Sequence, residues 1–239
     1  MPLVAAYFRP DSLDEALSLL AQPNRVPLAG GTTVNADRAH ERVEVVDLQA
    51  LGLSGISADS DRVRIGATTT LAELADSPLM PAAVQRIAKA EEPSTLRTLA
   101  TVGGTVASGN NESVLTAALL VCDAQVELAG ADNLALTDLL ASGVPAGAII
   151  TAVTVDPSGD MADAATGRTP ADVPIVAAVA RKSGVDTSVA LTGVADTPVL
   201  VDPADPAGAI SPPDDFRGSS SYRLELARVL TNRAIEALR

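Results

Sequence analysis

Two segments of the sequence share the pattern that constrains the fold most: a short apolar run, a pair of glycines and then threonine. They are LAGGTT, residues 28–33, and TVGGT, residues 101–105. Glycine has no side chain, so the backbone can approach a bound molecule closely, and successive N–H groups can surround an anion. Threonine hydroxyls add further donors. Together the two loops predict a site that holds a pyrophosphate with few cationic side chains.

The spacing of these glycines excludes two common phosphate-binding motifs. Gly104 and Gly109 have the four-residue gap of a P-loop, but Asn110 and Asn111 stand where lysine and then serine or threonine must follow. In addition, no GxGxxG opens a helix with an acidic residue some twenty positions further on. The sequence therefore supports neither nucleoside-triphosphate hydrolysis nor a Rossmann dinucleotide site.

The composition excludes several other classes of function. With 239 residues, 47% of them hydrophobic, the chain can bury a sizeable core in one large domain or two ordinary ones. A net charge of −13 opposes binding to nucleic acid or to an anionic membrane surface. We see no export signal and no apolar run that spans a bilayer, so we expect a cytoplasmic protein.

The chain has a single cysteine, Cys122, and a single histidine, His40. Cys122 lies in an apolar run, so we expect a small buried side chain, and His40 lies in a polar stretch, so we expect a solvent-facing one. A zinc site, an iron–sulfur cluster or a Ser/His/Asp triad would need residues that the chain lacks or has only once. We therefore predict no catalytic residue and no metal ligand in this chain.

Hydrophobic periodicity predicts a mixed α+β protein. The elements expected from it are helices at 12–22, 70–74, 80–90 and 114–121 and strands at 26–29, 43–48, 62–66, 125–128 and 149–155. The glycines and asparagines of TVGGTVASGNN make a helix unfavourable there, so we expect a loop.

A polar stretch near the middle of the second half, residues 156–169, predicts a connection between two domains. Beyond it, the apolar runs 173–180 and 185–194 flank a turn at 181–184, which predicts a β-hairpin, and TPVLV adds a third strand. A final helix is expected from about 221 to 238. These assignments predict a domain over residues 1–160 and a smaller one over 170–239.

Ordered along the chain, many segments resemble the FAD-binding (medium) subunits of molybdenum hydroxylases, the carbon monoxide dehydrogenase and xanthine dehydrogenase family. The segments that carry the resemblance are FRPDSLDEALSLL, LAGGTTV, VVDLQALGLSGI, RIGATTTLAELADSPLM, LRTLATVGGTVASG, LLVCDAQVEL, IITAVTVD and DFRGSSSYRLELARVL. The resemblance implies a two-lobed FAD-binding domain of the vanillyl-alcohol-oxidase type. It also implies a small C-terminal domain with a three-stranded antiparallel sheet and a helix.

The same resemblance implies where FAD would lie and what it would do. Electrons would pass from a large molybdopterin subunit through a [2Fe–2S] small subunit to the flavin, and on to an external acceptor. The pyrophosphate would lie on both glycine loops, and one apolar residue would lie against the flavin ring. The residues implied are Ala29, Gly30, Gly31, Thr32 and Thr33 of the first loop, Thr101, Val102, Gly103, Gly104 and Thr105 of the second, and Ile149 beside the ring.

The sequence departs from the family in three places. Val114 stands where many members of the family carry an aspartate that binds the cofactor, with Glu112 and Ser113 beside it as substitutes. Segments 136–150 and 201–215 are shorter than usual. Two alternatives therefore stay open beside a working FAD subunit: a non-enzymatic scaffold or interaction protein of the same fold that has lost FAD, and a stand-alone flavoenzyme.

Overall fold

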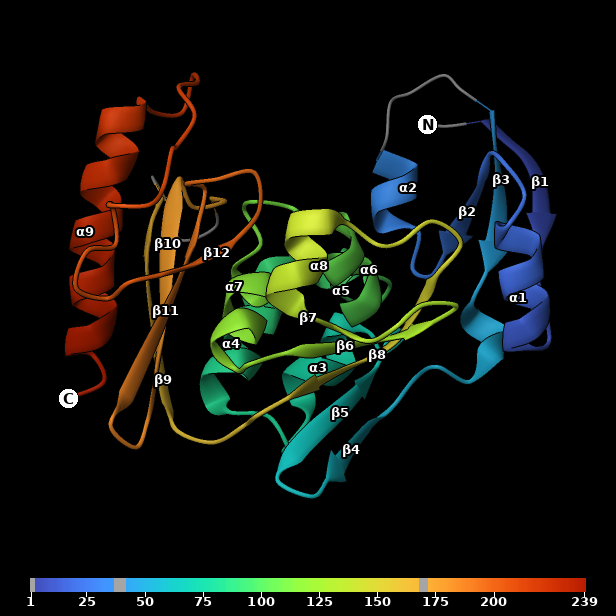
Figure 1. Cartoon of the computed structure of the whole chain (residues 1–239), viewed down its shortest axis with the longest axis horizontal. Coiled ribbons are helices and arrows are strands. Elements are labelled where there is room, and N and C mark those ends of the chain that lie inside the picture. The colour runs from blue at the N-terminus through green and yellow to red at the C-terminus, as the bar shows by residue number, and fades with distance from the viewer. Residues whose placement is uncertain (1–2, 37–41, 168–171) are drawn as a thin grey trace.

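The computed structural model describes residues 3–36, 42–167 and 172–239, so the prediction for His40 lies outside the described residues. The fold is mixed α/β with three separate sheets, arranged side by side along the long axis of the molecule (Figure 1). The N-terminal sheet lies at one end, the C-terminal sheet with its long helix at the other, and the largest sheet lies between them (Figure 1).

The N-terminal lobe is built on a parallel sheet of β1 (Leu3–Phe8), β3 (Arg42–Asp47) and β2 (Arg25–Leu28), in that order. The helix α1 (Leu13–Leu20) joins β1 to β2, and Ser12 caps it as predicted, since its side chain accepts a hydrogen bond from Glu15 N. The lobe has its own small core, formed by Ala16, Leu20, Val46, Leu48 and Ile149.

The central sheet has five antiparallel strands in the order β4-β5-β8-β6-β7. Their bounds are Ile56–Asp59, Arg62–Gly66, Ile149–Val155, Gln125–Ala129 and Leu134–Ala135. The short helices that accompany it are α3 (Leu71–Asp76), α4 (Ala82–Glu91), α5 (Ser94–Arg97), α6 (Val102–Ser108), α7 (Val114–Val121) and α8 (Leu136–Ser142). The short helices α2 (Thr32–Ala36) and η1 (Gln49–Leu51) lie with the N-terminal lobe instead (Figure 1). Nearly every residue of α7 is buried, so this helix forms the centre of the largest core.

The C-terminal sheet is antiparallel, in the order β12-β11-β10-β9, and differs from the prediction by one strand. β10 (Val176–Ser183) and β11 (Asp186–Thr192) form the predicted hairpin, β12 (Val199–Val201) is the predicted third strand, and α9 (Ser220–Glu236) is the final helix. The fourth strand is β9 (Asp160–Thr166), which lies in the segment predicted to be a connection.

The prediction of a connection at 156–169 is therefore wrong for residues 160–166, half of that segment. The sequence DMADAAT has few large apolar residues and no β-branched residue before its last position, so it carries little strand signal. As an edge strand it is stabilised by backbone pairing with β10 along its whole length, from Asp160 opposite Lys182 to Thr166 opposite Val176. Backbone pairing with β10 therefore supplies the stability that the side chains of β9 do not.

The prediction of a loop at TVGGT is also wrong, because α6 begins at Val102 directly after Thr101. Thr101 caps this helix, since its side chain accepts a hydrogen bond from Gly104 N. The glycines that lower helix propensity are needed for packing: a Cβ on Gly103 would lie 2.7 Å from Ala67 Cβ. Close packing of α6 on the segment after β5 therefore outweighs the local preference.

A buried arginine connects the C-terminal sheet to the rest of the molecule. Arg181 of β10 is 6% exposed, and its guanidinium donates to Val121 O at 3.0 Å, to Ser158 O at 2.7 Å and to the Asp156 carboxylate. These acceptors lie at the end of α7 and just after β8.

No helix in the described ranges has the length and apolar character needed to cross a membrane.

Candidate cofactor site

The predicted glycine loops come together in the structure on the wall of one cavity of about 410 Å³. This volume lies within the range of about 300–1,000 Å³ that small-molecule and cofactor sites occupy. The cavity lies between the N-terminal lobe and the central part of the molecule, and each of them forms one wall. The segment before β8 forms a third wall. Its principal lining residues are Ala29, Gly30, Gly31, Thr32, Thr33, Thr101, Gly103, Gly104, Ala107, Ser108, Val144, Pro145, Ala146, Gly147, Ala148 and Ile149.

The first glycine loop requires glycine at both positions. A Cβ on Gly30 would lie 1.7 Å from Leu99 O, so the backbone here passes directly against the segment before α6. Gly31 has φ +71°, a left-handed conformation that other residues rarely adopt. Immediately after it, α2 begins at Thr32, so the chain turns from a strand into a short helix at the cavity wall.

The two loops differ in the availability of their backbone donors. Among the described residues, the N–H groups of Gly30, Gly31 and Thr32 have no hydrogen-bond acceptor. By contrast, four of the five N–H groups of the second loop are used within the fold. They are Val102 N to Thr69 O at 2.9 Å, Gly103 N to Ala67 O at 2.9 Å, Gly104 N to Thr101 Oγ1 at 3.2 Å and Thr105 N to Thr101 O at 2.9 Å. Backbone donors without a protein acceptor are therefore concentrated in the first loop.

The second loop supplies a wall of the cavity, but two of its predicted residues do not line it. Val102 is fully buried, and Thr105 donates its hydroxyl to Thr101 O at 3.1 Å. Gly104 does line the cavity, and a Cβ there would meet only Thr101 Oγ1, at 3.0 Å. Glycine at 104 thus keeps space open in the cavity, while glycine at 103 permits packing on the protein side.

Ile149, the residue implied to lie against the flavin ring, lines the cavity at the start of β8 and is 1% exposed. Its side chain packs with Leu20 and Leu48 in the core of the N-terminal lobe. It therefore joins the apolar base of the cavity to that core. The segment 144–148 beside it was not predicted to belong to the site; its small residues and glycine carry no signal beyond that of a turn.

Only one charged residue, Arg25, is found among the cavity-lining residues that the structure describes. Its Nε donates to the Glu44 carboxylate at 2.7 Å, and its guanidinium lies 4.3 Å from the centre of the Phe8 ring. The arginine charge is thus already paired within the N-terminal lobe. A ligand in the cavity would meet mainly backbone, hydroxyl and apolar groups, which agrees with the expectation of a site with few cations.

The residues around Val114 do not face the cavity. Val114 opens α7 and packs against the central core, while Glu112 forms an ion pair with Arg217. Ser113 donates its hydroxyl to Glu91, whose carboxylate also accepts Leu115 N at 3.0 Å. Glu112 and Ser113 are therefore engaged within the protein and do not stand in for a cofactor-binding aspartate.

The single cysteine has the environment that the sequence predicted. Cys122 is fully buried at the end of α7, and its sulfur lies 3.6 Å from Met161 Sδ. Burial raises the pKa of the Cys122 thiol to about 12, so the thiolate is not formed at neutral pH. Cys122 therefore contributes packing to the core and no nucleophile to the site.

Comparison with known proteins identifies the family. Residues 3–157 match the family described as "FAD binding domain in molybdopterin dehydrogenase". An uncharacterised Escherichia coli protein, YgfM, is 31% identical over 95% of this chain and 94% of its own. The carbon monoxide dehydrogenase medium chain of Afipia carboxidovorans is 28% identical over 96% of this chain and 95% of its own.

Solved structures agree with the sequence matches. A chain of the reconstituted CO dehydrogenase from Oligotropha carboxidovorans superposes with a TM-score of 0.88 at 27% identity, covering 99% of this chain and 98% of that one. A chain of the carbon monoxide dehydrogenase from Hydrogenophaga pseudoflava has the same fold, with a TM-score of 0.90 at 22% identity over 100% of this chain and 98% of that one. The protein belongs to the family of FAD-binding subunits of molybdopterin dehydrogenases, of the carbon monoxide dehydrogenase and xanthine dehydrogenase type.

Proposed function

We propose that this chain is the FAD-carrying subunit of a molybdenum-containing hydroxylase and that FAD occupies the cavity between the N-terminal lobe and the central sheet. The observation that carries the proposal is that both glycine loops, whose corresponding glycines are 73 positions apart, line one cavity of cofactor size. The family is defined by an FAD-binding domain, and the matched residues 3–157 include both loops.

In this proposal the pyrophosphate lies against the first glycine loop. The N–H groups of Gly30, Gly31 and Thr32 are free to donate to phosphate oxygens, and the hydroxyls of Thr33 and Thr101 lie at the same cavity. Backbone donors can hold a diphosphate without a lysine or arginine, which suits a chain of net charge −13.

The second loop has a different task in the same proposal. Gly103 allows α6 to pack closely on Ala67, and Gly104 leaves open space for the cofactor. Val102 and Thr105 hold α6 in place from the protein side, and Ala29 leads into the first loop. Ile149 offers an apolar surface to the flavin ring, where it excludes water.

FAD, when bound, supplies the redox chemistry, which belongs to the cofactor rather than to side chains. We infer that electrons reach it from a [2Fe–2S] small subunit, after oxidation of substrate on a large molybdopterin subunit, and leave to an external acceptor. The fold would then be a two-lobed flavin domain of the vanillyl-alcohol-oxidase type within a cytoplasmic complex. The residues of this chain bind and orient the cofactor.

An interaction scaffold without FAD is less well supported. A chain that had lost its cofactor would have no need to keep a cavity lined by both glycine loops, with backbone donors of the first loop left without a protein acceptor. A stand-alone flavoenzyme would need substrate-binding groups at the flavin, and the cavity offers mainly glycine, threonine and apolar side chains.

A turnover assay separates these alternatives. The full chain, purified alone with FAD, should show little oxidation of aldehydes, purines or carbon monoxide, since the substrate site lies on another subunit. Co-expression with a [2Fe–2S] small subunit and a molybdopterin large subunit from the same organism should yield a complex that contains this chain and is active. Robust turnover by the chain alone would instead identify a stand-alone flavoenzyme.

A further inference from the structure

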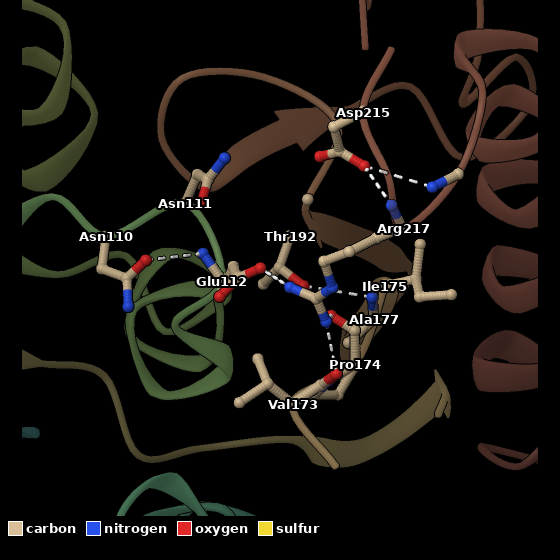
Figure 2. A network of polar contacts seen from close by, with 12 residues as sticks. Asn110, Asn111, Glu112, Val173, Pro174, Ile175, Ala177, Thr192, Asp215 and Arg217 are labelled. Carbon is tan, nitrogen blue, oxygen red and sulfur yellow. Dashed lines mark hydrogen bonds and ion pairs between the residues drawn. The ribbon is translucent and has the colours of Figure 1, made fainter. Parts of the chain in front are cut away.

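The loop between α6 and α7, residues 109–113, is held by residues that lie outside the matched FAD-binding domain. This domain ends at residue 157. Glu91, inside the domain, binds Ser113, but the partners of Asn111 and Glu112 come from the connection between β11 and β12 and from the turn before α9. Figure 2 shows Asn110, Asn111 and Glu112 facing Asp215 and Arg217 across this contact.

Arg217 is the centre of the contact. Its guanidinium forms an ion pair with Glu112 and donates to the backbone oxygens of Val173, at 2.6 Å, and Pro174, at 3.1 Å (Figure 2). The arginine side chain is 20% exposed and the glutamate side chain 32%. A forked guanidinium can bind a carboxylate and two carbonyl groups at once, which an ammonium group cannot do in the same geometry.

The turn that carries Arg217 is itself rigid. The Asp215 carboxylate accepts Arg217 N at 2.8 Å and Gly218 N at 3.1 Å, and it accepts two hydrogen bonds from Arg223, at 2.8 and 2.7 Å. Arg223 is 2% exposed and also donates to Gly193 O at 2.7 Å. Arg217 is therefore presented from a fixed support.

Asn111 provides a second connection between the loop and the C-terminal sheet. Its backbone oxygen accepts Gly193 N at 2.8 Å, and its side-chain amide donates to Ala195 O at 3.2 Å. Both partners lie in the connection between β11 and β12. The loop is thus fixed from two directions by the same domain.

A continuous chain of hydrogen bonds connects Arg217 to the cavity wall. Glu112 N donates to Asn110 Oδ1 at 3.1 Å, and Asn110 N donates to Ser108 Oγ at 3.3 Å. Ser108 ends α6 and lines the cavity. The glycines at the start of α6 form another part of that wall. The hydrogen bonds through Glu112 therefore fix the C-terminal end of a helix whose N-terminal end also lines the cavity.

We infer that Arg217 is a positioning residue for the cofactor: through Glu112, Asn110 and Ser108 it holds α6 at the distance from the first glycine loop that FAD requires. The inference rests on the proposed function, because it assigns to the C-terminal domain a share in FAD binding at that same cavity. Coupling through such a contact typically changes affinity by about 3- to 30-fold.

The test measures FAD affinity by flavin fluorescence in the full-length chain, well below its unfolding temperature. Arg217→Ala should weaken FAD binding about tenfold, and Arg217→Lys, which keeps a cation for Glu112 but cannot reach both carbonyls, should fall between that variant and the wild type. Arg86→Ala is the matched control, because the Arg86–Asp163 ion pair also joins α4 to the C-terminal sheet but contacts no residue of the 109–113 loop. The control should bind FAD like the wild type.

A second readout separates this inference from the proposed function. In the FAD-free protein, amide hydrogen exchange within α6 should be faster in Arg217→Ala than in the wild type and unchanged in Arg86→Ala. Wild-type affinity in Arg217→Ala, or equal loss in both variants, would overturn the inference. Unchanged hydrogen exchange in α6 of Arg217→Ala would overturn the inference whether or not FAD binds. Failure of every form, the wild type included, to bind FAD would contradict the proposed function instead.

Discussion

Glu91 shows at the residue scale how a carboxylate can be held inside this fold. It ends α4 and accepts hydrogen bonds from the Ser113 hydroxyl and from Leu115 N, at the N-terminus of α7. Burial raises the pKa of the Glu91 carboxyl above its ordinary value of 4.5, and the hydrogen bonds from Ser113 and the backbone only partly oppose this effect. The folded protein therefore binds this proton more tightly than the unfolded chain does.

The sign of this difference predicts a pH dependence of stability. Because the folded-state pKa is raised, the contribution of Glu91 is fully present below about pH 4.5 and is lost as the pH rises through the folded-state value. Glu91→Gln, which cannot ionise, should lack this decrease. Both proteins are unfolded in urea at a series of pH values from about 4 to 8. The difference between their unfolding free energies should change only between about pH 4.5 and the folded-state pKa of Glu91. A difference that does not vary with pH would contradict the account.

The sequence predicts some of the residues that line the cavity but not their neighbours there. Gly30, Gly31, Gly103 and Gly104 were identified because a paired glycine beside threonine is a local pattern. Arg25 and the segment 144–148 carry no such pattern and join the site only through the tertiary fold. The ion pair of Glu112 with Arg217 joins residues more than a hundred positions apart, so no local pattern predicts it.

The helix α6 shows the limits of prediction at the scale of an element. Local propensity opposes a helix that begins Val-Gly-Gly, yet the Thr101 cap and contact with Ala67 form one. Elements with strong local signals, such as the capped helix α1 and the β-branched strand β8, were predicted correctly. β9 was missed for the same reason as α6, since small residues leave the outcome to pairing and packing.

The adjacent glycines of α6 provide a matched pair of variants. Gly103→Ala should lower the free energy of unfolding by about 1–3 kcal/mol, because the new methyl group would overlap Ala67 Cβ and O. Gly104→Ala should change the free energy of unfolding less than Gly103→Ala does, because its methyl group would meet only Thr101 Oγ1, at 3.0 Å, and alanine favours a helix. Even so, Gly104→Ala should weaken FAD binding, because its methyl group enters the cavity.

Urea denaturation and flavin titration of the two variants give opposite results in this account. Gly103→Ala should lose mainly stability, and Gly104→Ala should lose mainly affinity. Equal stability losses with unchanged FAD affinity in Gly104→Ala would show that the second loop does not border the cofactor.

At the scale of the whole molecule, buried polar contacts and the helix α7 join the central sheet to the C-terminal sheet. Arg181 connects β10 to the ends of α7 and β8, and α7 itself packs against both the central core and the C-terminal sheet. The cavity lies on the opposite side, where the N-terminal lobe meets the central sheet. The mixed α/β class and the order of most elements follow from hydrophobic periodicity; the shared cavity follows only from how the lobes meet.

The most direct test of the central claim is a titration of the FAD-free full-length chain with FAD, followed by flavin fluorescence and by release of bound flavin on denaturation. The account predicts saturable binding of one FAD per chain, with affinity that falls in Gly104→Ala while far-ultraviolet circular dichroism stays unchanged. A well-folded chain that retains no FAD at saturating concentration, or that binds it equally well in the Gly104→Ala variant, would contradict it.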